Sequence, residues 1–294
     1  MRIFSLVTIF ALAAVFLCVD QASSAGGPIV VLRPPRRGRR ETEPWEREMA
    51  SVETDTPGAP TGDTGARGGA LPSGCTSRAG ATVTVGSPAG DRVALSFDDG
   101  PSVTQTPPIL ATLKRLHGRA TFFEEGRHVH GREELMREIL AAGDEIGNHS
   151  YHHPEYPGNG ELAATDQKIR EAVGFEPCLF RPPYGLIDAK VTAAARRNGL
   201  EMVLWTLDSE DDHHPGVAAI VHNVVEGATP GAIILMHDGG HHPQTVRALP
   251  AVIKGLRARG LHFATVTELL GGRMIYRHTM RTRPGRRGRR PRGR

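Results

Sequence analysis

The sequence predicts an α/β fold built on a parallel sheet, and two observations carry that prediction. Short apolar runs typical of buried strands alternate with longer amphipathic patterns typical of helices over residues 92–266. An alternation of this kind implies that the strands pair in parallel. Residues able to do chemistry follow directly after several apolar runs, which is where α/β barrels place their active sites.

The elements follow one another in a regular order. Strands are predicted at residues 92–98, 119–123, 145–148, 177–180, 201–207, 232–236 and 262–266. Helices are predicted between them, at residues 104–116, 132–142, 159–173, 188–198, 216–227 and 245–259. The roughly 200 residues around these elements are enough for one domain. We expect that domain to span residues 76–271.

The first 25 residues have the pattern of a cleaved signal peptide. Arg2 precedes an apolar stretch from Ile3 to Val19, and small residues lead to a cleavage point after Ala25. An uncleaved membrane anchor is the alternative, because about 17 apolar residues approach the span of a bilayer. The small residues favour cleavage, so we expect a secreted protein, free or associated with the cell wall.

Two segments outside the domain have biased compositions. Residues 26–75 are rich in Pro, Gly, Arg and Thr and poor in apolar residues, which predicts a disordered linker. Residues 272–294 carry ten Arg and no acid, so the net charge of +4 becomes −6 when these ten are subtracted. This basic tail could contact an anionic cell-wall polymer or membrane surface, or be solvated. Nucleic acid is disfavoured, because no aromatic residue follows Tyr276 and the chain is exported.

Removal of the signal peptide would leave two of the three cysteines, Cys75 and Cys178. An even pair in an oxidising compartment makes a disulfide plausible. Two separate free thiols are the alternative, and the sequence leaves both open.

Two motifs carry the candidate chemistry. Asp98 and Asp99 end an apolar run, and at a strand end their side chains should point to opposite faces and serve different partners. An Asp-Gly turn with solvated acids is the alternative. His149 and His153 are four residues apart, so on a helical turn both rings would share one face and form half of a zinc site that Asp99 could complete.

Not every histidine belongs to such a site, since the chain holds 14 of them. His152 lies between the two candidate ligands, and its offset should turn it away from their shared face. The pairs His213-His214 and His241-His242 are expected to be chance pairs and not metal ligands.

Four segments occur in an order that resembles the polysaccharide deacetylases, the NodB-homology domain of carbohydrate esterase family 4. They are Ser96–Pro101, Asn148–Pro154, Phe180–Gly185 and Leu235–Gly239, and the resemblance covers about residues 92–270. It implies a distorted (β/α)7 barrel. It also implies hydrolysis of acetyl groups on a glycan.

The resemblance assigns a role to each matching residue. Asp98 would be the general base, and Asp99, His149 and His153 would hold a divalent metal, with Zn²⁺ favoured over Co²⁺ or a similar ion. Arg181 would pair with the base and orient it. On the substrate side, the backbone N–H of Tyr184 would stabilise the oxyanion, with Pro183 beside it, and Leu235 would line the acetyl pocket. His237 would be the general acid, supported by Asp211.

These roles make chemical sense together. A neutral amide resists hydrolysis, so a catalyst needs a Lewis acid that lowers the pKa of its bound water, a base and an acid. The expected activity is N-deacetylation of peptidoglycan or a chitin-like N-acetylglucosamine polymer. An O-acetyl esterase acting on xylan with the same site, or a glycan-binding relative without turnover, are the alternatives.

The sequence departs from the family pattern in two places. The motif that usually reads Asp-x-x-Asp-Trp continues here from Asp211 into Asp212, so an acid replaces the tryptophan and the substrate groove is altered. Glu124 and Glu125 follow an apolar strand where relatives usually remain apolar. We expect that strand to end there and both acids to be solvated.

Overall fold

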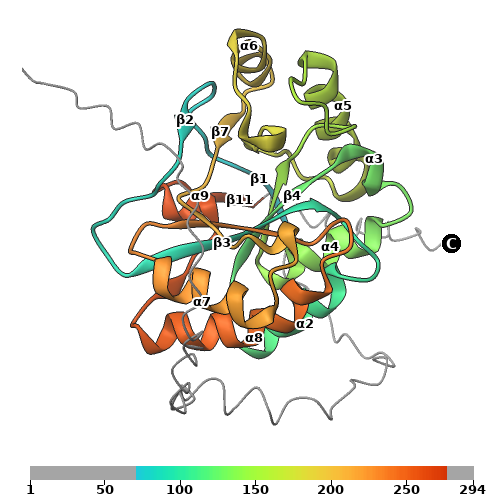
Figure 1. Ribbon diagram of the computed structural model, residues 1–294. Coiled ribbons are helices and arrows are strands. Elements are labelled where there is room, and N and C mark those ends of the chain that lie inside the picture. The colour runs from blue at the N-terminus through green and yellow to red at the C-terminus, as the bar shows by residue number, and fades with distance from the viewer. Residues whose placement is uncertain (1–70, 277–294) are drawn as a thin grey trace, which may run out of the picture. The chain divides into compact units, whose positions relative to one another are not determined.

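The computed structural model describes residues 71–276, and a curled parallel sheet forms its centre (Figure 1). The strand order is β2-β7-β6-β5-β4-β3-β9-β8, and β10 pairs with the start of β3. The strands are β2 (Thr82–Val83), β3 (Arg92–Gly100), β4 (Ala120–Glu124), β5 (Glu145–Asn148), β6 (Leu179–Phe180), β7 (Glu201–Val203), β8 (Leu207–Asp208), β9 (Ile233–His237) and β10 (His262–Phe263). The predicted parallel sheet is therefore confirmed.

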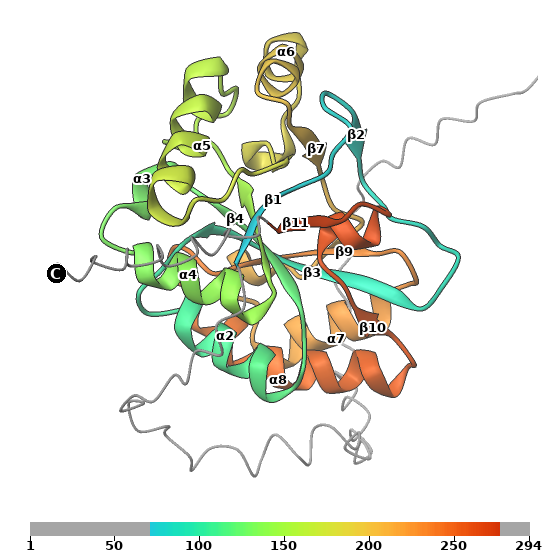
Figure 2. The ribbon, with the colours of Figure 1, turned by 180° about the vertical axis from the view of Figure 1, so that it is seen from behind.

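Six helices surround the sheet and lie close to the predicted ranges (Figures 1 and 2). They are α2 (Thr106–Arg115), α4 (Glu133–Ala142), α5 (Asn159–Val173), α6 (Ala189–Arg197), α7 (Val217–Gly227) and α8 (Pro243–Ala258). Shorter helices are α3 (Gly126–Val129), α9 (Val266–Leu269) and the 3₁₀ turns η1 (Pro183–Gly185) and η2 (Asp211–His213). None of the helices within residues 71–276 is long and apolar enough to span a bilayer.

The two edges of the sheet approach each other, which gives the distorted barrel. Val85, just after edge strand β2, forms an antiparallel bridge with Ala232, just before β9. The backbone N–H of Gly86 donates to the carbonyl of Gly231 at 2.8 Å. The expected (β/α)7-type barrel is thus confirmed, although its strands are unequal in length. Residues 204–206 interrupt the strand predicted at 201–207, which divides into β7 and β8.

The longest strand, β3, lies in the middle of the sheet, and every residue from Val93 to Phe97 is buried. It pairs with β4 on one side and β9 on the other. Phe97 stacks on Phe122 of β4 with ring centroids 5.2 Å apart. Burial of one such aromatic side chain contributes roughly 1.5–3 kcal/mol. This packing fixes the carboxyl end of β3, where the acidic pair lies.

A small antiparallel sheet joins the two ends of the described chain. It pairs β1 (Pro72–Cys75) with β11 (Met274–Tyr276), and neither strand was predicted. The fold therefore extends a few residues into the segments interpreted as linker and tail. The predicted signal peptide at 1–25, linker residues 26–70 and tail residues 277–294 lie outside the described residues.

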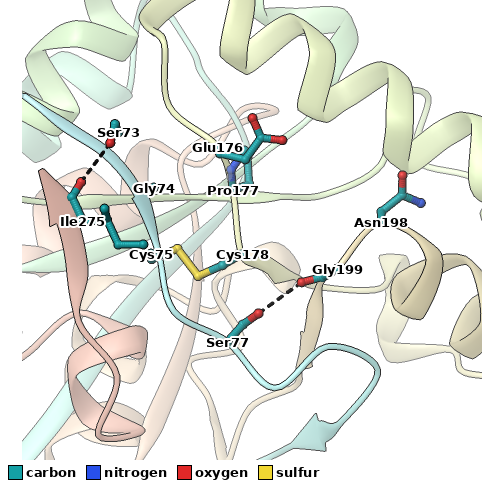
Figure 3. Close-up of a pocket in the computed structure, with 10 residues that line it drawn as sticks. All are labelled: Ser73, Gly74, Cys75, Ser77, Glu176, Pro177, Cys178, Asn198, Gly199 and Ile275. Atoms are coloured by element: carbon teal, nitrogen blue, oxygen red, sulfur yellow. Dashed lines mark hydrogen bonds between the residues drawn. A yellow bond between two sulfur atoms is a disulfide. The ribbon is translucent and has the colours of Figure 1, made fainter. Parts of the chain in front are cut away.

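A disulfide joins Cys75 to Cys178 beside this small sheet, with a Cα–Cα distance of 5.6 Å (Figure 3). It lines a pocket of about 340 Å³ with Ser73, Glu176 and Ile275 among its walls. Because Cys178 directly precedes β6, the pocket lies at the amino ends of the strands. The chemistry-bearing motifs follow the opposite, carboxyl ends. Of the two alternatives left open for the cysteines, the structure has the disulfide.

Candidate active site

Three candidate ligands meet at the carboxyl ends of β3 and β5. The Oδ1 atom of Asp99 lies 3.3 Å from Nε2 of His149 and 3.4 Å from Nε2 of His153. The three residues form a group able to hold a metal ion, with ligand atoms within 4.8 Å of one another. The predicted set is therefore brought together.

The chain reaches this arrangement by a different route from the one predicted. Residues 149–153 are irregular, with a bend at Tyr151 and His152 and no helical turn, and His153 has a positive φ of 61°. The helical-turn prediction is therefore wrong, and the rings converge because the turn folds back, with centroids 4.9 Å apart. Asp99 also has a positive φ, 72°, at a register shift between β3 and β4.

This local twist also corrects the prediction that the two acids face opposite ways. The Oδ2 atom of Asp98 lies 3.8 Å from Nε2 of His149, the same nitrogen that Asp99 contacts. Both carboxylates therefore meet one imidazole, although their other partners differ.

The donor set fits a divalent cation. Nδ1 of His149 lies 2.7 Å from the carbonyl oxygen of Arg181, so it carries the proton and leaves Nε2 as the ligand atom. A metal-binding histidine is normally held in this way by a backbone carbonyl. Oδ1 of Asp99 is buried and accepts no hydrogen bond from any of the residues 71–276. Burial raises the pKa of Asp99, but the close approach and the charge of His149 outweigh it and hold that pKa far below its usual range.

A second group in the described residues, Cys75, Glu145 and Cys178, also has closely spaced ligand atoms. Its two thiols are joined in the disulfide. They are therefore not thiolate ligands, and we assign no metal to this group.

Arg181 and Asp98 form a buried ion pair. Nη1 of Arg181 donates to Oδ1 of Asp98 at 2.8 Å, and the arginine is fully buried. The guanidinium also donates to the carbonyl oxygens of Val203 and Leu204 and packs 4.2 Å above the ring of Phe123. Its position is fixed from several sides, so it fixes Asp98 in turn.

His237 and Asp211 form a hydrogen-bonded pair, the third group of the site after the candidate metal ligands and the pair of Arg181 with Asp98. Nδ1 of His237 lies 2.7 Å from Oδ1 of Asp211, while the backbone N–H of His237 donates to Oδ2 at 2.9 Å. The hydroxyl of Thr245, which the sequence did not point to, donates to the same oxygen at 2.5 Å. Burial lowers the pKa of His237, but Asp211 outweighs it and raises the pKa to about 9. His237 is therefore protonated at neutral pH.

The substrate-side residues lie around these units. Tyr184, with a φ of 57°, is one of the most exposed large side chains, and its ring meets His153 edge-on at 4.6 Å. Pro183, the residue before Tyr184, is buried. Leu235 lies on β9 opposite Ser96 of β3, two residues before His237. Asp212, at the altered position, is exposed beside His213.

Glu124, the last residue of β4, and Glu125, the next residue, contradict the expectation that they are solvated. Glu124 is completely buried, and Glu125 is 3% exposed and pairs with Arg127 at 2.6 Å. Within the part of the chain that the structure describes, the Glu124 carboxylate has no hydrogen-bond partner. Burial, together with the nearby Asp238 charge, raises its pKa. The strand ends at Glu124, one residue beyond the predicted range 119–123, and Glu124 pairs there with Gly100 of β3. Charge alone gave no signal of this burial.

The other histidines of the predicted pairs lie outside the group formed by Asp99, His149 and His153. His152 contacts Glu161 at 2.9 Å, away from the ligand group, and His213 pairs with Glu210. Neither they nor His214, His241 and His242 belong to a metal-binding group of the described residues. However, the ring of His242 lies against His237, a contact that the sequence did not indicate.

Comparison with known proteins identifies the family of this chain. A family profile described as polysaccharide deacetylase matches residues 86–203. A peptidoglycan-N-acetylglucosamine deacetylase of Bacillus cereus is 40% identical over 187 residues, covering 60% of this chain and 87% of the relative. The chain belongs to the polysaccharide deacetylase family.

Solved structures of this deacetylase family share the fold. A peptidoglycan N-acetylglucosamine deacetylase matches with a TM-score of 0.63 at 30% identity, covering 67% of this chain and 95% of the other. A pseudoenzyme of the same carbohydrate esterase family, from Bacillus anthracis, matches with a TM-score of 0.61 at 31% identity, covering 66% and 70%. The family is therefore one of glycan deacetylases that also has members without activity.

Proposed function

We propose that this protein is a secreted, metal-dependent deacetylase that hydrolyses the N-acetyl groups of peptidoglycan or a chitin-like N-acetylglucosamine polymer. One observation carries the proposal: the proposed base, Asp98, and the proposed metal ligand Asp99 both lie next to the imidazole of His149. Asp98 reaches Nε2 of His149 at 3.8 Å, and Asp99 reaches it at 3.3 Å. A base next to a cation site is the arrangement that hydrolysis of an unreactive amide needs.

Asp99, His149 and His153 would hold the divalent ion, Zn²⁺ or Co²⁺. Once bound, that ion supplies Lewis acidity at the acetyl carbonyl and lowers the pKa of water. Two imidazole nitrogens and one carboxylate oxygen suit such ions and leave room for substrate.

Asp98 would take the proton from the attacking water. Its Oδ1 is occupied by Arg181 at 2.8 Å, so Oδ2 is the oxygen left to accept that proton. The guanidinium keeps the carboxylate in one orientation, and a fixed acceptor avoids the reorganisation that a mobile one would need. Arg181 therefore acts through Asp98 and not on the substrate.

His237 would return a proton to the departing amine. Its Nδ1 is committed to Asp211 at 2.7 Å, so the proton on Nε2 is the one it can donate. A pKa raised to about 9 keeps that proton in place at neutral pH. An amine leaves poorly without protonation, whereas an alcohol from an ester needs less help. Because Asp211 keeps His237 protonated, this site favours an amide substrate over an ester.

Tyr184, Pro183 and Leu235 would shape the substrate side. The backbone N–H of Tyr184 would stabilise the developing oxyanion, for which one donor is typically worth about 3 kcal/mol. The exposed Tyr184 ring offers a face to a sugar. Leu235 would contact the acetyl methyl group.

Acetate release tests the proposal directly. The purified protein, with and without chelator, is given N-acetylglucosamine oligomers, peptidoglycan and acetylxylan. Release from either of the first two that stops with chelator supports the proposal. Release only from acetylxylan would make the protein an O-acetyl esterase, and no release by the metal-loaded protein would place it with the inactive relatives.

Secretion is proposed from the N-terminal pattern alone. Expression in a bacterial host followed by N-terminal sequencing of protein from the medium should give a chain that begins at Gly26. A full-length chain retained in the membrane fraction would indicate an anchor instead. Removal of the Arg-rich segment 277–294 should reduce sedimentation with cell walls if that segment contacts their anionic polymers.

A further inference from the structure

Two imidazole rings pack in series against the ring of His237, the proposed general acid. His242 lies against His237 with ring centroids 5.2 Å apart, and His214 lies against His242 at 5.3 Å. The rings come from β9, from the loop before α8 and from the residue after η2. His214 is exposed and His242 is half-buried, so the stack runs from the surface to the acid.

The loop that carries His242 is held in place by one buried side chain. Gln105, which is 4% exposed, donates from Nε2 to the carbonyl oxygens of Gly239 at 3.0 Å and Gly240 at 2.7 Å. Its Oε1 accepts the backbone N–H of His242 at 2.8 Å. Three hydrogen bonds from a single amide therefore set the backbone from which the ring projects.

The neighbouring glycine leaves space for the ring. Gly240 has a φ of 59°, and a Cβ atom there would lie 2.9 Å from Nε2 of His242. Any other residue at this position would displace the imidazole as well as strain the backbone. The site therefore accommodates the ring closely.

Packing, and not a polar partner, holds the imidazole of His242. Its Nδ1 is buried and has no hydrogen-bond partner among residues 71–276. Burial lowers the pKa of His242, and the positive charge of His237 lowers it further. A neutral aromatic ring thus faces the cationic imidazolium, and such contacts are favourable.

We propose that His242 is a positioning residue for His237. Its neutral ring holds the imidazole of His237 in the orientation in which Nδ1 meets Asp211 and Nε2 remains available to the leaving amine. His214 covers the outer face of His242. This inference rests on the proposed function, because it concerns the residue assigned there as the acid.

The kinetic test compares His242→Ala with His242→Phe, which keeps a ring without nitrogens. His242→Ala should lower kcat on an N-acetylglucosamine oligomer by about tenfold or more, as expected when an acid loses its orientation, with little change in KM. His242→Phe should recover most of that loss. Turnover of an activated aryl acetate should be nearly unchanged in both variants, because its leaving group needs no acid. His241→Ala, at the exposed neighbouring residue, is the matched control.

A spectroscopic test does not depend on turnover or on metal. The Nδ1 proton between His237 and Asp211 should give a low-field proton resonance, given the 2.7 Å separation. In His242→Ala this resonance should broaden and exchange faster with water, whereas His242→Phe should keep it sharp. Circular dichroism of both variants checks that the fold is intact.

Two outcomes would overturn the inference. One is an equal loss on amide and aryl ester in His242→Ala, which would indicate a general defect. The other is a sharp Nδ1 resonance in His242→Ala with unchanged kcat. The proposed function is judged separately through His237→Ala: if that variant shows no selective loss on amides, the acid assignment fails and this inference fails with it. An amide-selective loss in His237→Ala without one in His242→Ala overturns only the inference.

Discussion

Arg181 and Asp98 form a 2.8 Å ion pair in which neither side chain is more than 5% exposed. A buried charge needs such a partner, because an unpaired one is strongly destabilising. The pair also links two parts of the site, since the carbonyl oxygen of Arg181 holds His149 at 2.7 Å. One residue therefore orients both the proposed base and a proposed metal ligand.

The acidic pair should separate in function on substitution. Asp98→Asn should retain metal but lose about 10²- to 10⁴-fold in kcat, since an amide oxygen cannot take the proton from water. Asp99→Asn should weaken metal binding itself. Metal content by atomic spectroscopy and acetate release from the same preparations distinguish the two. Equal metal loss in both variants would contradict the assignment.

Replacement of a proposed metal ligand should weaken metal binding and leave the fold intact. His149→Ala and His153→Ala should weaken Zn²⁺ affinity by more than 100-fold, since even an outer partner of a ligand is worth roughly 10- to 100-fold. Chelator should abolish acetate release by the wild type, and Zn²⁺ or Co²⁺ should restore it. His213→Ala is the control, because His213 pairs with Glu210 outside the group. Full activity in a metal-free preparation would exclude the metal requirement.

The disulfide should stabilise the barrel without taking part in catalysis. Cys75 and Cys178 are 103 residues apart, and loss of a native disulfide typically costs about 2–5 kcal/mol. Replacement of both by Ala should lower the urea midpoint by a corresponding amount. The kcat below the unfolding transition should stay unchanged, because the bond lies at the amino ends of the strands. A selective loss of kcat in the folded variant would show that the disulfide reaches the active site.

Sequence reasoning found most of the barrel because its helices are amphipathic and its strands are buried. α5, for example, has the predicted bounds, Asn159–Val173. Sequence reasoning missed β1 because Pro-Ser-Gly-Cys has no strand pattern, and that strand forms by pairing with β11, about 200 residues later, and by a bridge from Gly74 to Glu176. Such long-range pairing leaves no local signal.

Within the candidate site, residue identities were predicted better than conformations. The prediction of a helical turn from His149 to His153 was wrong. The backbone at His153 has a positive φ, and this conformation brings the two imidazole rings together without a helix. Glu124 was interpreted as solvated because charged residues are seldom buried, yet it is completely buried beside Gly100 of β3 and has a raised pKa. The contact of His242 with His237 depends on the bonds of Gln105, which join residues more than 130 positions apart.

His237 and Asp211 give the sharpest pH prediction. An imidazole has an ordinary pKa near 6.5, and Asp211 raises that of His237 to about 9 despite burial. The acid is therefore protonated at pH 7, and activity should fall as the pH rises through about 9. Asp211→Asn removes the negative charge, so the pKa of His237 should fall and the alkaline limb of the kcat profile should move to lower pH.

Folding stability should also decrease as the pH rises. The raised pKa of His237 stabilises the folded protein below about pH 6.5, and this contribution is lost as the pH rises through about 9.

The substrate dependence of His237→Ala completes the test. Hydrolysis of an N-acetyl substrate should fall by about 10²- to 10⁴-fold, because the amine then leaves unprotonated. An activated aryl acetate should lose much less. Equal losses on the two substrates, or identical alkaline limbs for the wild type and Asp211→Asn, would show that His237 is only a wall of the pocket. A selective loss with a shifted limb would identify Asp211 as the residue that keeps the acid charged.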